Sequence, residues 1–197
     1  MKKIKKTTVA MLFLFSSLLT MAQVQYNADT EISVLNWKGF KPTGDHYGIV
    51  KIKKGFFTIK DSQVTGGEFE IDMNSIIDLD MEADSEYNTK LVNHLKSEDF
   101  FSVEKFPIAT FKMSKTEKKG DKTLVTGDLN IKGITHAVSF LALIKIENEN
   151  LHVKSEPFKI DRSKWNVKYK SKSFFGDLGD KFIYDDIELS FEVNAKQ

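Results

Sequence analysis

The sequence predicts an all-β protein, an eight-stranded antiparallel barrel with one inserted α-helix. Three observations support this prediction. Apolar and polar residues alternate with a period of two along most of the chain after Tyr26, as they do in strands with one buried face. Short connections that contain Gly, Asn or Asp separate these runs, and one segment, residues 84–96, breaks the alternation. The 197 residues suffice for one domain with its own core.

Three strands are expected before the break, at residues 32–40, 48–60 and 68–73. In the third, the apolar side chains of Phe69 and Ile71 alternate with acidic residues, so one face is expected to be buried and the other solvated.

Five strands are expected after the break, at residues 109–115, 123–131, 137–146, 152–160 and 187–193. The last shows the clearest alternation. Residues 137–146 are almost continuously apolar, so we expect this strand to contact protein or ligand on both faces.

Turn residues mark positions 65–67, 119–121 and 147–150. Connections this short favour antiparallel neighbours. Antiparallel strands in this number either stack as a sandwich or close into a barrel, and we expect a barrel because closure removes exposed edges. The interior of an eight-stranded barrel is filled by side chains or holds one small ligand. Periodicity does not distinguish these two cases.

Residues 84–96 are polar and poor in β-branched residues, with Tyr87, Leu91 and Leu95 at spacings of four. This spacing predicts a helix of about three turns with three apolar side chains on one face. Asp84 or Ser85 is expected to cap its start.

Residues 1–22 have the features of a secretory signal peptide, namely a lysine-rich start, an uncharged apolar run at residues 9–20 and small residues at Thr20 and Ala22. The run is shorter than the ~20 residues that a membrane span needs, although an uncleaved anchor is an alternative. We expect cleavage near Ala22, a mature domain of residues 23–197 and a periplasmic or secreted location. Removal of four lysines changes the net charge from +1 to −3.

The composition excludes several classes of protein. The chain has no cysteine, which rules out disulfide scaffolds, thiol nucleophiles, cysteine zinc sites, iron–sulfur clusters and lipid anchors on cysteine. The near-neutral charge argues against a nucleic-acid partner.

Two blocks carry a family resemblance. Residues 93–101 (NHLKSEDFF) and 104–111 (EKFPIATF), followed by residues 126–135 (TGDLNIKGIT), closely resemble the YceI-like family of lipid- and polyisoprenoid-binding proteins. A weaker match covers residues 46–48 and 55–57. The resemblance extends over nearly all of the mature chain.

The resemblance implies an exported, lipocalin-like barrel whose elongated interior holds an isoprenoid, a quinone or a similar long amphiphile. It implies a binding or carrier protein without catalysis. The chain departs from the family at residues 90–93 (KLVN), where an Arg-Asp pair is usual, and in a long polar segment at residues 161–186. Both departures concern the identity of the ligand.

A pocket for such a ligand would be lined by rings and aliphatic side chains, and the mature chain has 21 aromatic residues. The alternative is that these residues fill a dry core. Chosen by strand face and by nearness to the family blocks, the expected lining residues are Phe40, Ile49, Phe69, Ile71, Leu91, Leu95, Phe101, Phe111, Phe140 and Trp165.

Two histidines are the expected polar residues at the pocket mouth. His46 and His94 can each hydrogen-bond a quinone carbonyl or a prenyl head group. For His94, the alternative is a structural hydrogen bond that holds the helix to the barrel.

Neither a metal nor a resident cofactor is expected, and a polyprenyl quinone or other isoprenoid lipid would be a ligand. The four histidines form no closely spaced pair. The aspartates near the C-terminus lack the spacing of an EF-hand.

No Gly-x-Ser-x-Gly elbow and no phosphate-binding glycine loop is present, so we expect no enzyme. An enzyme acting on a hydrophobic substrate in the cavity and a filled-core interaction module are the two alternatives.

The expected partner is a hydrophobic small molecule or lipid, bound by a monomer or homodimer. Lysine-rich stretches at residues 51–54, 115–122 and 164–172 would allow transient contact with anionic lipid head groups. The alternative is that they form a solvated outer face.

Overall fold

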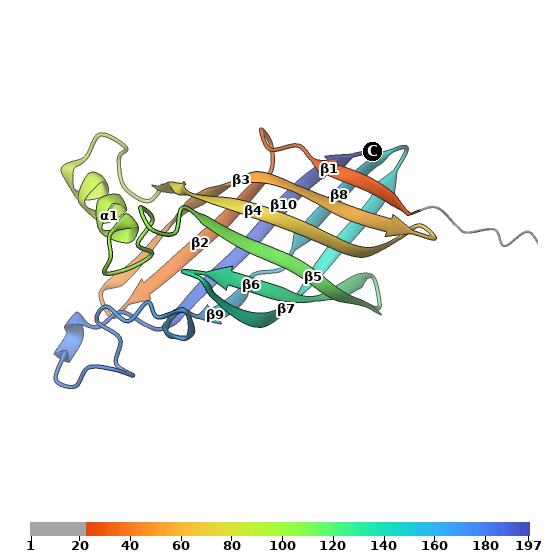
Figure 1. Cartoon of the computed structure of the whole chain (residues 1–197). Coiled ribbons are helices and arrows are strands. Elements are labelled where there is room, and N and C mark those ends of the chain that lie inside the picture. Colours follow the sequence, from red (N-terminus) through yellow and green to blue (C-terminus); the bar gives the residue numbers. More distant parts are fainter. Residues whose placement is uncertain (1–22) are drawn as a thin grey trace, which may run out of the picture.

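The computed structural model describes residues 23–197, which form ten strands, one α-helix and two 3₁₀ helices (Figure 1). The elements are β1 (Val24–Ala28), β2 (Val34–Lys41), β3 (Gly44–Lys60), β4 (Gln63–Asp78), α1 (Glu86–Lys96), β5 (Ile108–Lys119), β6 (Lys122–Ile131), β7 (Ile134–Glu147), β8 (Asn150–Ser155), β9 (Phe158–Asp161), η1 (Arg162–Trp165), η2 (Gly179–Lys181) and β10 (Asp186–Lys196). The predicted signal peptide lies outside the described residues.

The ten strands occupy eight positions around a closed antiparallel barrel. β1 and β2 follow each other along one position, between β10 and β3. β8 and β9 share the position on the other side of β10. The pairing of β8 with β10 closes the ring. The predicted barrel is therefore confirmed. At two of its eight positions, two shorter strands take the place of one continuous strand.

The interruptions have local causes. Pro157 lies between β8 and β9, and proline has no N–H for the ladder. The predicted strand at residues 152–160 is therefore two short strands. β1 was not predicted, since its five residues contain a single buried apolar side chain, that of Tyr26.

The turn predicted at residues 65–67 is wrong, because β4 passes straight through it. The chain turns instead at Asp61 and Ser62, whose φ angles are +52° and +59°, as a two-residue hairpin loop requires. Gly67 is required within the sheet, because a Cβ at this position would lie only 2.7 Å from the Phe56 carbonyl oxygen. The predicted turns at residues 119–121 and 147–150 are both present.

Glycines in the strands make room for aromatic rings of the interior. A Cβ on Gly55 would lie 2.2 Å from the Phe69 ring, and one on Gly127 would lie 2.4 Å from the Phe111 ring. Each ring covers the glycine of a neighbouring strand. The interior packs as two apolar clusters, one at each end of the barrel.

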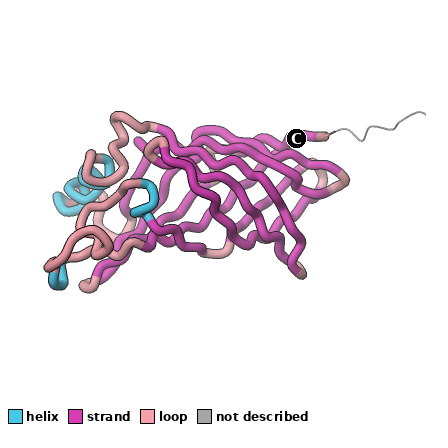
Figure 2. Tube along the Cα trace, turned by 60° about the horizontal axis from the view of Figure 1, so that its bottom comes forward, coloured by secondary structure: helices cyan, strands magenta, loops and turns pink. Residues whose placement is uncertain are grey.

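Both helical parts gather at one end of the barrel, here called the mouth end, where α1 and residues 162–185 lie (Figures 1 and 2). The described N-terminus and the C-terminus lie toward the other end (Figure 1). Of residues 23–197, no helix combines the length and apolarity that crossing a membrane requires.

The helix α1 begins at Glu86, two residues after the start of the predicted segment. Ser85, one of the two expected caps, is its N-cap, and the Ser85 hydroxyl accepts from the Tyr87 N–H. The predicted apolar face is partly wrong, since Tyr87 is 75% exposed. The inner face consists of the buried Asn88 and the half-buried Leu91 and Leu95, which line the first cavity. The Asn88 amide donates to Asp78 at the end of β4 and to the Met81 carbonyl oxygen, and these bonds fix the rotation of the helix.

Candidate ligand-binding cavity

The barrel contains two apolar cavities in line. The first, of about 150 Å³, lies at the mouth end and is bounded by α1, by the barrel wall and by the segment that follows β9. The second, of about 80 Å³, lies deeper. Both are lined almost entirely by apolar side chains. Apolar cavities of this size stay dry and accept apolar molecules.

β10 shows how the two cavities are arranged along the barrel. Ile187 lines the first cavity, Leu189 lines both, and Phe191 and Val193 line the second. These residues share one face of the strand because side chains alternate. Four residues therefore form a junction between the cavities: Leu35, Ile71, Leu129 and Leu189.

The structure brings nine of the ten apolar residues predicted from the sequence to the cavity walls. Phe40, Leu91, Leu95, Phe101 and Trp165 line the first cavity, Phe69, Phe111 and Phe140 line the second, and Ile71 lines both. Ile49 lines neither cavity. Its neighbours on β3, Val50 and Ile52, are the buried, inward-facing residues there, which is the opposite strand face from the one assigned to Ile49.

The second cavity is built around the ring of Phe140. This ring stacks on Phe158 with centroids 4.7 Å apart and meets Phe191 edge-on at 5.0 Å. Phe111 lies 5.6 Å away on the other side of the barrel interior. Rings in these offset and edge arrangements attract each other beyond their burial, so the deep cavity has well-defined walls.

Trp165 lies in the segment that follows β9 and forms part of the wall of the first cavity. It is 2% exposed, and its indole N–H donates to the Leu129 carbonyl oxygen at 3.1 Å. This bond satisfies the only polar atom of the side chain, so the ring presents an apolar face to the cavity.

Arg162, which precedes Trp165 by one turn, is also buried and lines the first cavity. Its guanidinium donates to the carbonyl oxygens of Tyr184, Val167, Tyr169 and Ile183 at 2.8–3.1 Å. Burial lowers the pKa of this group, while the nearby carboxylates of Asp185 and Asp161 act in the opposite direction. Its role is to hold residues 162–184 in a closed loop, and sequence reasoning missed it.

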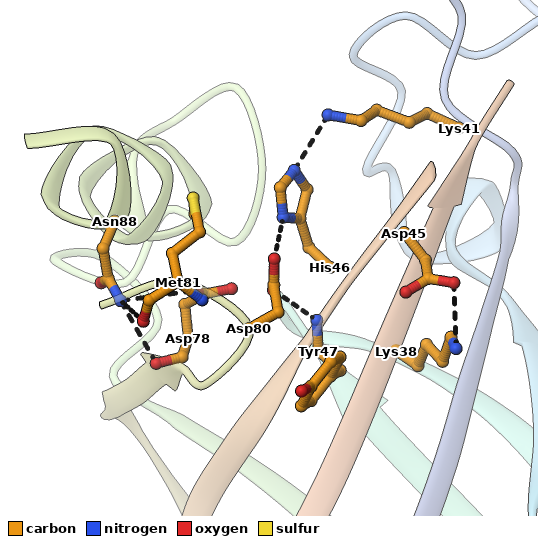
Figure 3. Close-up of polar contacts among 9 residues, drawn as sticks. All are labelled: Lys38, Lys41, Asp45, His46, Tyr47, Asp78, Asp80, Met81 and Asn88. Carbon is orange, nitrogen blue, oxygen red and sulfur yellow. Dashed lines mark hydrogen bonds and ion pairs between the residues drawn. The ribbon is translucent and has the colours of Figure 1, made fainter. Parts of the chain in front are cut away.

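A polar group marks the entrance. His46 and Lys41 both line the first cavity, and the Lys41 Nζ lies 3.0 Å from the His46 Nε2 (Figure 3). An ammonium only donates, so Nε2 is the acceptor and Nδ1 carries the ring proton. Nδ1 donates to Asp80 Oδ2 at 3.0 Å. Asp80 also accepts from the Tyr47 N–H at 3.0 Å, which fixes the orientation of the imidazole.

The other predicted polar residue, His94, does not line either cavity. Its Nε2 lies 3.2 Å from Asp99 Oδ2, and its ring packs edge-on against Phe100 and Tyr169. These contacts hold α1 against the residues that follow it and against the segment that contains Tyr169. Lys41 was not predicted as part of the site, since it ends a strand at a hairpin and no local pattern distinguishes it from other surface lysines.

Asp78 links the entrance to the helix. Its Oδ2 accepts from the Asn88 amide at 3.2 Å and from the Met81 N–H at 3.1 Å (Figure 3). Burial, and next the hydrogen bond with Asp80, raise the pKa of Asp78 to about 6. Burial also acts to raise the pKa of Asp80, but hydrogen bonds from Asp78, the Tyr47 N–H and His46 lower it overall. Asp78 Oδ1 is buried and accepts no hydrogen bond from the described residues, which adds to the tendency of this carboxyl to retain its proton.

His46, Asp78 and Asp80 also place one potential metal ligand each within 4.8 Å of one another. The contacts around them are those of a hydrogen-bonded chain, because Lys41 contacts the second ring nitrogen of His46, and the Asn88 amide and the Met81 N–H donate to Asp78 Oδ2.

We expect the stability of the protein to fall as the pH rises through the Asp78 pKa. The pKa of Asp78 is about 6 in the folded chain, whereas the ordinary pKa of this side chain is 3.8; the unfolded chain therefore releases the proton first, and stability decreases between these values. Asp78→Asn cannot ionise and can donate to Asp80. In thermal unfolding from pH 4 to pH 8, this variant should lose several degrees less in Tm than the parent. Asp128→Asn, an exposed carboxyl on β6, is the control and should follow the parent; equal losses in all three proteins would contradict this assignment.

Comparisons with known proteins agree with this architecture. The family model described as YceI-like domain matches residues 26–195. A UPF0312 protein of Photorhabdus laumondii is 29% identical over 150 residues, which is 74% of this chain and 72% of that protein. Protein YceI of Escherichia coli is 31% identical over 96 residues, 49% of this chain; this match spans about half the length of that relative, 47%.

Solved structures show the same fold. The structure of BcnA from Burkholderia cenocepacia has a TM-score of 0.65 at 20% identity, covering 86% of this chain and 99% of that one. A polyisoprenoid-binding domain from Saccharophagus degradans, implicated in plant cell wall breakdown, has a TM-score of 0.60 at 14% identity, covering 87% and 97%.

Proposed function

Because the chain belongs to the YceI-like family, we propose that it binds a long apolar lipid, an isoprenoid, prenylated quinone or similar amphiphile, inside the barrel and acts as a carrier or store for it. One observation carries this proposal: two apolar cavities lie in line along the barrel interior and meet at a junction of four aliphatic residues. A chain-like ligand fits such a series of compartments, and burial contributes about 0.8 kcal/mol per methylene. The similar domain from Saccharophagus degradans is described as polyisoprenoid-binding, which supports the same ligand class.

The entrance favours a ligand with an acceptor head group. Trp37 and Trp165 use their indole N–H groups on carbonyl oxygens, and the Arg162 guanidinium is held by four more. Lys41 has three donors and, among residues 23–197, makes one side-chain hydrogen bond, to His46. A quinone carbonyl or another oxygen at the mouth would therefore be bound by Lys41, with His46 holding the ammonium in place.

We further propose that the protein works outside the cytoplasm, in the periplasm or after secretion, because residues 1–22 have the pattern of a signal peptide. The cavity offers no activated nucleophile and no pair of carboxylates facing its interior among its lining residues, which favours binding over the alternative of an enzyme. The alternative of a filled core predicts instead that no ligand enters.

Intrinsic fluorescence provides a direct test, because the chain has two tryptophans and both line the first cavity. Addition of a prenylated quinone should quench this fluorescence saturably, at one ligand per chain. A small soluble quencher, which reduces the fluorescence of solvent-exposed tryptophan, is the positive control. If this quencher acts but the quinone does not, the result would contradict the proposed function.

The same titration tests the head-group contact. Lys41→Met keeps the length of the side chain and removes its charge, and it should weaken quinone binding about tenfold, since hydrogen bonds to charged groups contribute about 1.5–3 kcal/mol. Binding of a prenyl hydrocarbon without a head group should not change. Lys38→Met, on the same strand but paired with Asp45 at 3.0 Å, is the control. Equal affinity of Lys41→Met and the parent for the quinone would remove Lys41 from the site.

A further inference from the structure

Exposed apolar side chains concentrate at the mouth end. Of residues 23–197, eight large apolar side chains are exposed, and Ile32 is the one that lies away from this end. The other seven come from the ends of β3 and β4, from α1 and from the segment before β10: Tyr47, Ile77, Leu79, Tyr87, Phe174, Phe175 and Tyr184. Patches of this kind on a soluble domain mark interaction surfaces.

Residues 164–181, here called the mouth segment, add positive charge to this surface. They contain five lysines and two aspartates. In the part of the chain that the structure describes, the ion pairs involve none of these five lysines, whereas lysines on the barrel wall, such as Lys54 and Lys112, pair with glutamates. The mouth segment thus carries a net positive charge that no internal contact neutralises.

The aromatic tip of the mouth segment is a built structure. Phe174 and Phe175 are each 49% exposed, and their backbone N–H groups donate to the Ser171 carbonyl oxygen at 3.2 and 3.0 Å. The Lys168 Nζ lies 4.4 Å from the centroid of the Phe174 ring. Below the tip, Arg162 binds the carbonyl oxygens of residues on both strands of the loop. Both rings are therefore half-exposed on an ordered turn, and the ammonium of Lys168 lies beside the ring of Phe174.

We propose that the mouth segment docks the protein on an anionic phospholipid bilayer, with Phe174 and Phe175 inserted among the head groups and the surrounding lysines on the phosphates. The proposal rests on the function proposed above, because it places the cavity entrance against the source or destination of the lipid. Aromatic side chains favour the bilayer interface, and each lysine near an anionic membrane surface increases affinity by about fivefold. On the neighbouring α1, Lys90 is paired with Glu86, and the helix is followed by the acidic residues Glu98 and Asp99, so the contact is expected on the mouth segment and not on the helix.

Vesicle co-sedimentation tests this docking. The purified protein should bind phosphatidylcholine vesicles that contain phosphatidylglycerol, bind pure phosphatidylcholine vesicles more weakly, and dissociate as salt is raised. Phe174→Ser/Phe175→Ser and, separately, Lys168→Gln/Lys170→Gln/Lys172→Gln should each lower the affinity for the anionic vesicles at least about tenfold. Ile32→Ser, an equally exposed apolar site away from the mouth, is the matched control and should bind as the parent does. All variants share the same N-terminus, so differences among them arise in the mouth segment.

Vesicle binding and quinone uptake are measured separately, so that membrane docking can fail without lipid binding failing, and the reverse. Quinone uptake from detergent, followed by tryptophan fluorescence, should be unchanged in the phenylalanine variant, whose altered rings lie outside the cavity walls. Parent-like binding of either variant to the anionic vesicles, or no binding by the parent, would overturn the docking proposal while leaving lipid binding intact. A protein that docks on vesicles but never takes up a lipid would refute the proposed function instead.

Discussion

Replacing Arg162 with alanine is expected to lower the free energy of unfolding by about 3–5 kcal/mol, because the change leaves one buried and three partly buried carbonyl oxygens without their donor and opens a cavity beside them. The loss should be seen in chemical denaturation as a lower midpoint. Arg162→Lys should recover little of it, since an ammonium cannot reach carbonyl oxygens on both sides of the loop as the planar guanidinium does.

Lys164→Ala is the matched control for this prediction. Lys164 lies in the same 3₁₀ helix, η1, but is exposed and takes part in no ion pair with described residues. It should change stability by less than about 0.5 kcal/mol. If Arg162→Ala were as stable as Lys164→Ala, the hydrogen-bonded loop that walls the first cavity would not depend on Arg162.

Leu189→Trp should shorten the lipid that the barrel accepts. The larger side chain would fill the junction, so a chain long enough to need both cavities should bind about 100-fold more weakly, while a short prenyl alcohol, which needs only the first cavity, should be weakened much less. Affinities for a series of prenyl chains of increasing length, measured by tryptophan quenching, check this result. The substitution is expected to cost about 1–3 kcal/mol of stability, which a thermal unfolding curve monitors.

Ile187→Trp is the control on the same strand face. Ile187 lines only the first cavity, so this variant should weaken short and long chains alike. A Leu189→Trp protein whose affinity for long and short chains falls by the same factor would show that ligands do not cross the junction.

Most of the fold could be predicted from the sequence because strand alternation reports burial on one face. Residues 187–193 alternate strictly and lie within β10. The family blocks and the strand faces together also selected ten apolar residues, of which nine line the cavities. Ile49 was misassigned because β3 carries bulges, with register shifts on both sides of Lys51, and a bulge changes which residues face inward.

The polar part of the site could not be predicted in the same way. The functional surroundings of His46 depend on Lys41 at the end of β2 and on Asp80 beyond the end of β4, and only the closed sheet brings these positions together. Arg162 is the single arginine of the chain, but its carbonyl partners lie on a loop with no periodic pattern. His94 contacts Asp99, five residues later, and does not reach the cavity. The sequence spacing alone could not decide between these two positions of the ring.

The most direct test of the central claim is native mass spectrometry of the protein purified from cells that produce isoprenoid lipids, without detergent or delipidation. We predict a single additional mass per chain that corresponds to an isoprenoid lipid, is removed by solvent extraction and is regained when a prenylated quinone is added. A protein that is uniformly free of added mass before extraction, and that gains none in the presence of prenylated quinone, would contradict the claim that the barrel binds such a lipid.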